Sequence, residues 1–120
     1  MTLNEYQHRA MSTCMESCNN IAYMLTGLNA EVGEVNDKIA KAVRKNHIAI
    51  HRNELISWQD NGDHNAFVDE LKKELGDCLW FIAGLCFTLN IPLEEIAQQN
   101  LDKLASRQQR GVIDGNGDNR

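Results

Sequence analysis

Apolar residues recur through most of the chain at the spacing of one face of an α-helix. Between residues 20 and 45 the period is close to 3.6 residues, at Ile21, Met24, Leu25, Leu28, Val32, Val35, Ile39 and Val43. Three further helices are expected over residues 3–18, 66–89 and 92–110. The pattern therefore predicts an all-α fold of four helices, in a single domain that spans residues 1–110.

Two segments interrupt this helical pattern. Residues 46–65 are polar and hold three of the four histidines, and we expect them to form an insertion between the second and third helices. Within the insertion, residues 52–58 have the composition of a short helix. Residues 111–120 are rich in Gly, Asn and Asp, and are expected to form a C-terminal tail that either frays or contacts a bound phosphate.

The composition narrows the classes of function. Seventeen acids against twelve Lys and Arg give a formal net charge of −5, so attraction to nucleic acid or to an anionic membrane is not expected. A single proline and few glycines before residue 110 argue against an all-β fold, which needs frequent turns. The first ten residues are polar and do not resemble a signal peptide. We expect a cytoplasmic protein whose four cysteines stay reduced and face the core.

The third predicted helix is apolar nearly all round between Cys78 and Phe87. Such a helix has to be covered on several sides, and three other helices in a chain of this size supply little cover. We therefore expect a homodimer or a larger homo-oligomer. The nearly uncharged stretch from Cys78 to Pro92 is shorter than the about 20 residues of a membrane span.

Two acidic pairs occupy equivalent positions on the second and third helices. Glu31 and Glu34 form the first pair, and Glu74 and Asp77 the second, each spaced i,i+3 on one helical face. At about 100° per residue, both pairs fall roughly 60° and 120° to the same side of the apolar stripe of their helix. If the two helices pack as an antiparallel hairpin, the four carboxylates can converge.

Converging carboxylates repel one another, by ~4 kcal/mol at about 4 Å with an effective dielectric constant of about 20. Hard divalent cations such as Mg²⁺, Mn²⁺ or Ca²⁺ relieve this repulsion through oxygen ligands. Because Mg²⁺ commonly completes its coordination shell with substrate phosphates, the cluster points to phosphoryl chemistry. The alternative is that each acid is simply solvated at the edge of its helix.

Other chemistries have less support in the sequence. A di-iron bundle needs two Glu-x-x-His motifs, and the chain has one, from Glu5 to His8. A zinc site would use Cys14, Cys18 and a histidine, and nothing in the sequence positions a Cys–His nucleophile. Neither a Walker-type loop nor a Gly-x-Gly-x-x-Gly motif is present in the sequence.

Four segments carry these acids and several downstream polar residues in a characteristic context. They are Leu3-Asn-Glu-Tyr-Gln7, Gly27-Leu-Asn-Ala-Glu31-Val-Gly-Glu34-Val, Glu70-Leu-Lys-Lys-Glu74-Leu-Gly-Asp77-Cys-Leu-Trp80-Phe and Asn100-Leu-Asp-Lys103-Leu-Ala-Ser-Arg107. Over almost the whole chain the sequence resembles the MazG-like nucleoside triphosphate pyrophosphohydrolases. The resemblance implies an all-α, four-helix bundle-type fold in a dimer or tetramer. It also implies Mg²⁺-dependent hydrolysis of the α–β phosphoanhydride of (d)NTPs, which yields the monophosphate and pyrophosphate.

The resemblance also implies which residues form the site. The expected metal ligands and catalytic carboxylates are Glu31, Glu34, Glu74 and Asp77. The cofactor would be Mg²⁺, with Mn²⁺ as an alternative, and one of the carboxylates or a neighbour would help to activate the attacking water. The expected substrate-binding residues are Lys38, Phe81, Asn100, Lys103 and Arg107. A plain core position is the alternative for Phe81, and a surface position favoured by the helix dipole is the alternative for Lys103 and Arg107.

Two features depart from the family pattern. Ala30 stands where many members have an extra Glu, and the gap between the two acidic pairs is longer than in compact members. The insertion at residues 46–65 accounts for the longer gap. Its aromatic and imidazole side chains either reach the base of a nucleotide or lie at the surface or an interface: His47, His51, Trp58 and His64.

The favoured hypothesis is therefore a Mg²⁺-dependent pyrophosphohydrolase that removes surplus or non-standard (d)NTPs from the nucleotide pool. Its partners would be the nucleoside triphosphate and further copies of the chain, without nucleic acid or membrane. The second hypothesis is a non-catalytic helical oligomerisation or regulatory module that holds a cation.

Overall fold

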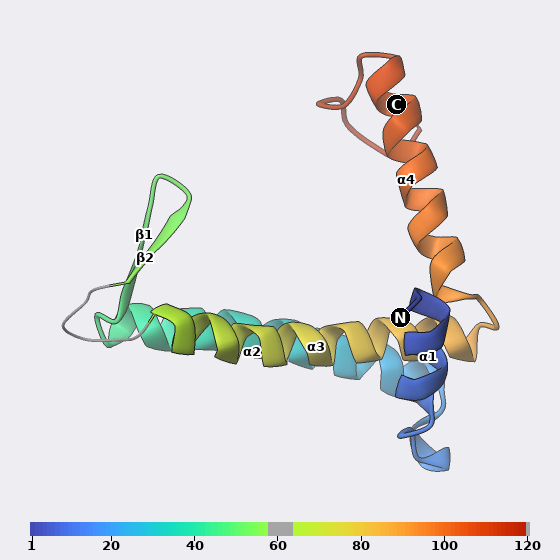
Figure 1. The fold of residues 1–120 in the computed structure, drawn as a ribbon, viewed down its shortest axis with the longest axis horizontal. Helices are drawn as coiled ribbons and strands as arrows, with labels where there is room; N and C mark the ends of the chain where they lie inside the picture. The colour runs from blue at the N-terminus through green and yellow to red at the C-terminus, as the bar shows by residue number, and fades with distance from the viewer. Residues whose placement is uncertain (58–63, 120) are drawn as a thin grey trace.

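The structure, a computed structural model, describes residues 1–57 and 64–119. Two long antiparallel helices lie side by side and form a rod, from which a β-hairpin projects at one end and a fourth helix at the other (Figure 1). The elements in chain order are α1 (Leu3–Met11), the 3₁₀ turn η1 (Glu16–Cys18), α2 (Ile21–Arg44), β1 (Ile48–His51), β2 (Glu54–Ser57), α3 (His64–Thr88) and α4 (Leu93–Gln109). The rod consists of α2 and α3. The prediction of an all-α fold with four helices is confirmed to the extent that the described chain is mainly helical and has four α-helices, while two short strands depart from it.

A side chain of each helix of the rod packs directly against a glycine of the other helix. A Cβ atom on Gly27 of α2 would lie 2.0 Å from the ring of Phe81, and a Cβ atom on Gly84 of α3 would lie 2.4 Å from the sulfur of Met24. Met24 and Phe81 are buried together with Met11 of α1, and form the main apolar cluster. The core therefore lies at the end of the rod where α1 crosses it.

The first helix is shorter than the predicted helix over residues 3–18, because its C-terminal carbonyls are taken by side chains. The hydroxyls of Ser12 and Thr13 donate to the carbonyls of Arg9 and Ala10, at 2.6 and 2.7 Å. Trp80 of α3 also donates to the Ala10 carbonyl, at 3.2 Å. These bonds end α1 at Met11, and the chain resumes in the short turn η1. At the other end, Thr2 and Glu5 form a capping box at the start of α1.

Side chains of α1 cap the N-terminus of α4. Its N-cap residue is Pro92, which offers no side-chain acceptor to the first free N–H groups of the helix. The amide oxygen of Gln7 accepts from the N–H of Leu93 at 3.1 Å, and Asn4 accepts from the N–H of Glu94 at 3.1 Å. The Gln7 amide nitrogen also donates to the carbonyl of Ile91, at 3.0 Å. Side chains of α1 thus fix the place at which α4 starts.

The insertion contains a β-hairpin, so the prediction of a short helix over residues 52–58 is wrong. Strands β1 and β2 pair antiparallel, with Ile48 opposite Ser57 and His51 opposite Glu54. The two turn residues, Arg52 and Asn53, both have positive φ angles of 48° and 67°. A two-residue turn with both φ angles positive matches the twist of a hairpin, and this turn chemistry outweighed the helical composition of the segment.

The expected tail also has structure in the described residues. The N–H of Val112 donates to the Arg107 carbonyl at 3.0 Å, and that of Gly115 donates to the Val112 carbonyl at 3.1 Å. The segment at 111–119 folds back along the last turns of α4 (Figure 1). It is therefore ordered against the helix instead of frayed.

Helix α4 turns away from α3 by 102°, and several of its apolar side chains are exposed: Ile96, Leu101 and Leu104. In the described part of the chain, no helix taken singly is long and apolar enough to cross a membrane.

Replacing Gly27 with Ala should destabilise the protein by roughly 1–3 kcal/mol, because the added methyl group overlaps the Phe81 ring and forces the two helices apart. The matched control is Gly33→Ala in the same helix, where no described atom lies within 4 Å of the added Cβ. This control should gain up to about 1 kcal/mol from helix propensity. Urea unfolding at equal protein concentration measures both, and equal stability of the two variants would contradict the close approach.

Candidate metal centre

Three carboxylates from the two helices of the rod converge. Glu31 of α2 and Glu74 and Asp77 of α3 can each offer one oxygen, and these oxygens all lie within 4.8 Å of one another. Glu31 lies one turn after Gly27 and Asp77 one turn before Phe81, so the close approach of the helices also brings the acids together. The matched helical phase of the two acidic pairs, inferred from the sequence, is the reason that they meet.

The carboxylates of the cluster are partly withdrawn from water and repel one another. Burial raises the pKa of Glu31, and the nearby negative charges of Asp77, Glu74 and Glu34 raise it further. Burial and then the charge of Asp77 also raise the pKa of Tyr6. A group of oxygen ligands whose negative charges disfavour one another suits a hard divalent cation. The donor set therefore fits Mg²⁺ or Mn²⁺.

Glu34, the fourth predicted ligand, is exposed and lies outside the group of converging oxygens. It lies one turn beyond Glu31 on α2, close enough for its charge to contribute to the raised pKa of Glu31. The structure thus brings together three of the four predicted carboxylates and leaves Glu34 at the edge of the cluster.

Lys38, predicted to bind phosphate, forms ion pairs with two acids of α3. Its Nζ lies 3.0 Å from a carboxylate oxygen of Glu70 and 3.3 Å from one of Glu74. Hydrogen bonds to Glu70 and then Glu74 raise the pKa of Lys38. Sequence reasoning did not assign a role to Glu70, although its position one turn before Glu74 was a usable signal. A lysine therefore already neutralises one edge of the cluster.

Phe81, predicted to line the nucleotide pocket or the core, lies in the core. Its side chain is 8% exposed. Its ring packs edge-on against Trp80 with centroids 5.0 Å apart, and at a tilt against Tyr23 at 5.6 Å. In the single chain, its position serves the packing of α2 against α3.

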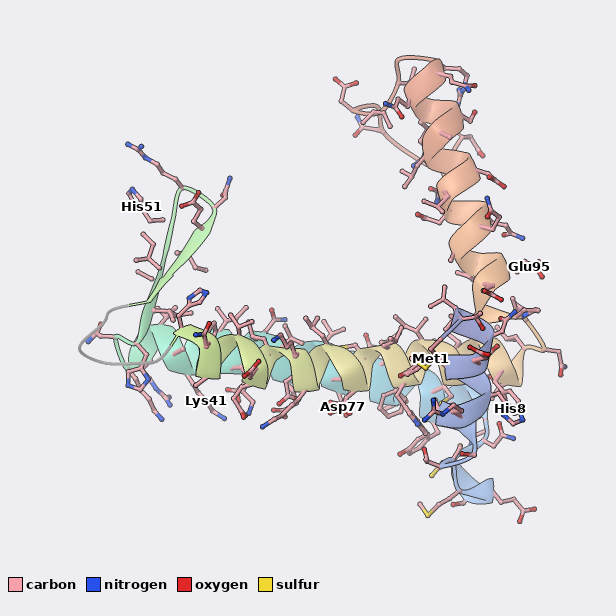
Figure 2. The ribbon with its side chains drawn as sticks, viewed as in Figure 1. Met1, His8, Lys41, His51, Asp77 and Glu95 are labelled. Atoms are coloured by element: carbon pink, nitrogen blue, oxygen red, sulfur yellow. The ribbon has the colours of Figure 1, made fainter. Side chains whose placement is uncertain are left out.

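The predicted phosphate contacts on α4 are not near the cluster of the same chain. Asp77 lies about 16 Å along α3 from the end of that helix, and Lys103 about 15 Å along α4 from its start. Because α4 turns away by 102°, the two residues are roughly 20 Å apart. Asn100 and Lys103 are exposed, whereas Arg107 is buried against the folded-back tail. Figure 2 shows Asp77 midway along the rod, well away from α4.

The histidines of the insertion lie at the opposite end of the rod from α4. His51 is exposed on the β-hairpin (Figure 2), His64 is exposed at the start of α3, and His47 is half-buried. Trp58 lies outside the described residues. Within residues 1–57 and 64–119, the carboxylate cluster is the one group of three or more Asp, Glu, His or Cys side chains that could hold a metal ion. In these residues, neither the cysteines proposed for a zinc site nor a histidine proposed for a di-iron site belongs to such a group.

By its fold and its carboxylate cluster, the protein is a mainly helical protein with a candidate metal site between two antiparallel helices. The family model described as "MazG nucleotide pyrophosphohydrolase domain" matches residues 19–112. The chain belongs to this family.

A curated phage protein is similar to the chain over its whole length. The chain is 35% identical over 127 aligned residues to the Gene 37 protein of Mycobacterium phage L5, and the alignment covers both chains in full. No solved structure is significantly similar to the chain.

Replacing Glu31 with Gln should raise the melting temperature in EDTA at neutral pH. Because the pKa of Glu31 is raised in the folded state, the unfolded state ionises first, and stability falls as the pH rises from the unfolded to the folded pKa. The neutral amide removes that penalty. It should also weaken Mg²⁺ or Mn²⁺ binding roughly ten-fold or more, as measured by calorimetry.

Glu34→Gln is the matched control, because Glu34 is exposed on the same helix and outside the converging group. It should change both quantities less than Glu31→Gln. Unchanged metal affinity in Glu31→Gln would exclude that carboxylate as a ligand.

Proposed function

We propose that the protein is a Mg²⁺-dependent nucleotide pyrophosphohydrolase, which hydrolyses a (d)NTP to the (d)NMP and pyrophosphate. The convergence of Glu31, Glu74 and Asp77, in a chain of the MazG nucleotide pyrophosphohydrolase family, is the observation that carries the proposal. The cellular role that follows is removal of surplus or non-standard nucleotides in the cytoplasm. Neither nucleic acid nor a membrane is needed for this role.

We assign the three converging carboxylates to hold the cation. When bound there, Mg²⁺ neutralises phosphate charge and lowers the pKa of a coordinated water. Glu34 is exposed one turn from Glu31, and we assign it the acceptance of the proton that the attacking water loses. Water adds to phosphorus, the α–β anhydride bond breaks, and pyrophosphate leaves with the bridging oxygen.

Lys38 supports this role from the edge of the cluster. Its ammonium group pairs with Glu74, a proposed ligand, and with Glu70, which is not one. Once Glu74 engages a cation, Glu70 remains as a partner that keeps the Lys38 side chain in place. From that position the ammonium group can contact a phosphate oxygen of the substrate, as predicted from the sequence.

We further propose that the protein works as a homodimer or homotetramer. Leu25 and Val32 are 46% and 48% exposed, and lie roughly 80–100° around α2 from the buried Met24. On α3, Leu75 and Leu79 are similarly exposed. For antiparallel helices these positions share one face of the rod, opposite the acidic face. A second rod would bury that apolar face.

The same assembly would bring the polar side chains of α4 to the carboxylate cluster of another copy. Because Lys103 is roughly 20 Å from the cluster of its own chain, we propose that Asn100, Lys103 and Arg107 contact a nucleotide bound to the cluster of another copy. The exposed apolar residues of α4 favour its packing on such a copy.

A panel of nucleoside and deoxynucleoside triphosphates with Mg²⁺, assayed for pyrophosphate release, tests the activity. Asp77→Asn and Glu31→Gln should lower turnover roughly 100-fold or more, with helicity by circular dichroism unchanged. The second candidate, a non-catalytic module with a cation site, predicts that Mg²⁺ raises the melting temperature while no nucleotide is hydrolysed. That result would overturn the enzymatic proposal.

Light scattering after size exclusion tests the oligomer. Leu25→Glu and Leu79→Glu place a charge on the apolar face and should shift the protein towards monomer. Thr26→Glu adds the same charge one residue further along α2, roughly 100° away from Leu25, and should leave the assembly intact. A wild-type protein that is monomeric at micromolar concentration would refute this part of the proposal.

A further inference from the structure

The guanidinium group of Arg107 is buried although it lies near the end of a helix that has few neighbours. Arg107 is 5% exposed. Its cover is the segment at 111–119, whose Val112 N–H donates to the Arg107 carbonyl at 3.0 Å. Burial of an arginine is costly unless its charge and its N–H donors are matched, so the partners of this side chain matter.

The partners are oxygens of the tail, and they all meet one nitrogen. The Nη2 atom of Arg107 donates to the carboxylate Oδ1 of Asp118 at 3.0 Å and to the Asp118 carbonyl at 3.1 Å. The carbonyl of Gly117 lies at 3.4 Å from the same atom. Among the described residues, the buried Nε atom has no hydrogen-bond partner. Nε and Nη2 form the side edge of the guanidinium, which pairs bidentately with carboxylates and phosphates. Half of that edge is therefore unused.

A second cation faces the same carboxylate. The Nζ atom of Lys103, one turn earlier on α4, lies 3.5 Å from Oδ1 of Asp118. A hydrogen bond from Arg107, followed by the charge of Lys103, lowers the pKa of Asp118. The Asp118 side chain is itself 84% exposed, so the anion lies at the open side of a buried guanidinium and can be displaced without unfolding the helix.

We propose that Asp118 is an internal competitor at the phosphate site that the family resemblance implies for Lys103 and Arg107. The proposal rests on the proposed function, because the phosphate it concerns is that of the nucleotide or of pyrophosphate. A phosphate has oxygens enough to engage Nε and Nη2 together and to reach Lys103. The tail carboxylate engages Nη2 and leaves Nε unpaired. Phosphate binding therefore displaces Asp118 from Arg107 and Lys103.

The competition has a measurable consequence. A ligand that binds only the open state has its apparent affinity reduced by the fraction of molecules in that state. Removing the charge of Asp118 raises this fraction. Asp118→Asn should therefore bind pyrophosphate roughly three- to ten-fold more tightly than the wild type at low salt. The gain should shrink at high salt, because both the competing ion pair and the phosphate contacts are screened.

Calorimetry of the full-length oligomer with pyrophosphate, without nucleotide, tests this. Asp114→Asn is the matched control, since it removes the same charge from the same segment at a residue that is not among the described ion-pair partners of Lys103 or Arg107. It should bind pyrophosphate as the wild type does. Adding Arg107→Gln to Asp118→Asn should abolish the gain, which locates the effect at α4.

The outcomes separate this proposal from the enzymatic one. Tighter pyrophosphate binding in Asp118→Asn, with no turnover of any nucleotide, supports the anion site while the proposed activity fails. Unchanged or weaker pyrophosphate binding in Asp118→Asn, with normal turnover, overturns the competitor role and leaves the activity standing. Weaker binding would mean that Asp118 orients the two cations for the ligand instead of competing with it.

Discussion

The close approach of α2 and α3 at Gly27 is the constraint on which the rest of the site depends. The Phe81 ring occupies the space that a side chain on residue 27 would fill. This contact fixes both the separation of the helices and their rotation about their axes. Glu31 and Asp77, each one turn away on its own helix, inherit that alignment. Aromatic packing in the core is thus what gathers the carboxylates, against their mutual repulsion.

The carboxylates of the cluster differ in whether a cation of the protein lies beside them. Glu74 is partly neutralised by Lys38, whose ammonium group it shares with Glu70. Glu31 has no ion pair of this kind among those the structure describes, and burial, followed by the negative charges of Asp77, Glu74 and Glu34, raises its pKa. Among the described ion pairs, none involves Glu31 of α2 or Asp77 of α3, so these two carboxylates of the cluster have no cation of the protein beside them. A divalent cation bound there would replace repulsion with attraction, which couples ligand binding to the stability of the rod.

Helical periodicity was enough to predict the long helices and the phase of the acidic pairs, because both are local properties of a regular repeat. It could not predict the direction of α4, which depends on Gln7 and Asn4 capping a helix 86 or more residues away. The hairpin was missed because the turn at Arg52 and Asn53 depends on backbone conformation more than on apolar spacing. The order of the tail was missed because it depends on particular contacts with α4, namely the backbone bond from Val112 to Arg107 and the carboxylate of Asp118.

The capping of α4 by α1 also sets the distance between the cations of α4 and the carboxylates of the rod. Gln7 directs α4 away from the rod, so the cations of α4 and the carboxylates of the rod stay roughly 20 Å apart within one protomer. Left alone, those cations would be unpaired beside exposed apolar side chains. The folded-back tail supplies these cations with an anion, Asp118. The direction of α4, on which the proposed oligomer rests, therefore also accounts for the contact of Asp118 with Lys103 and Arg107.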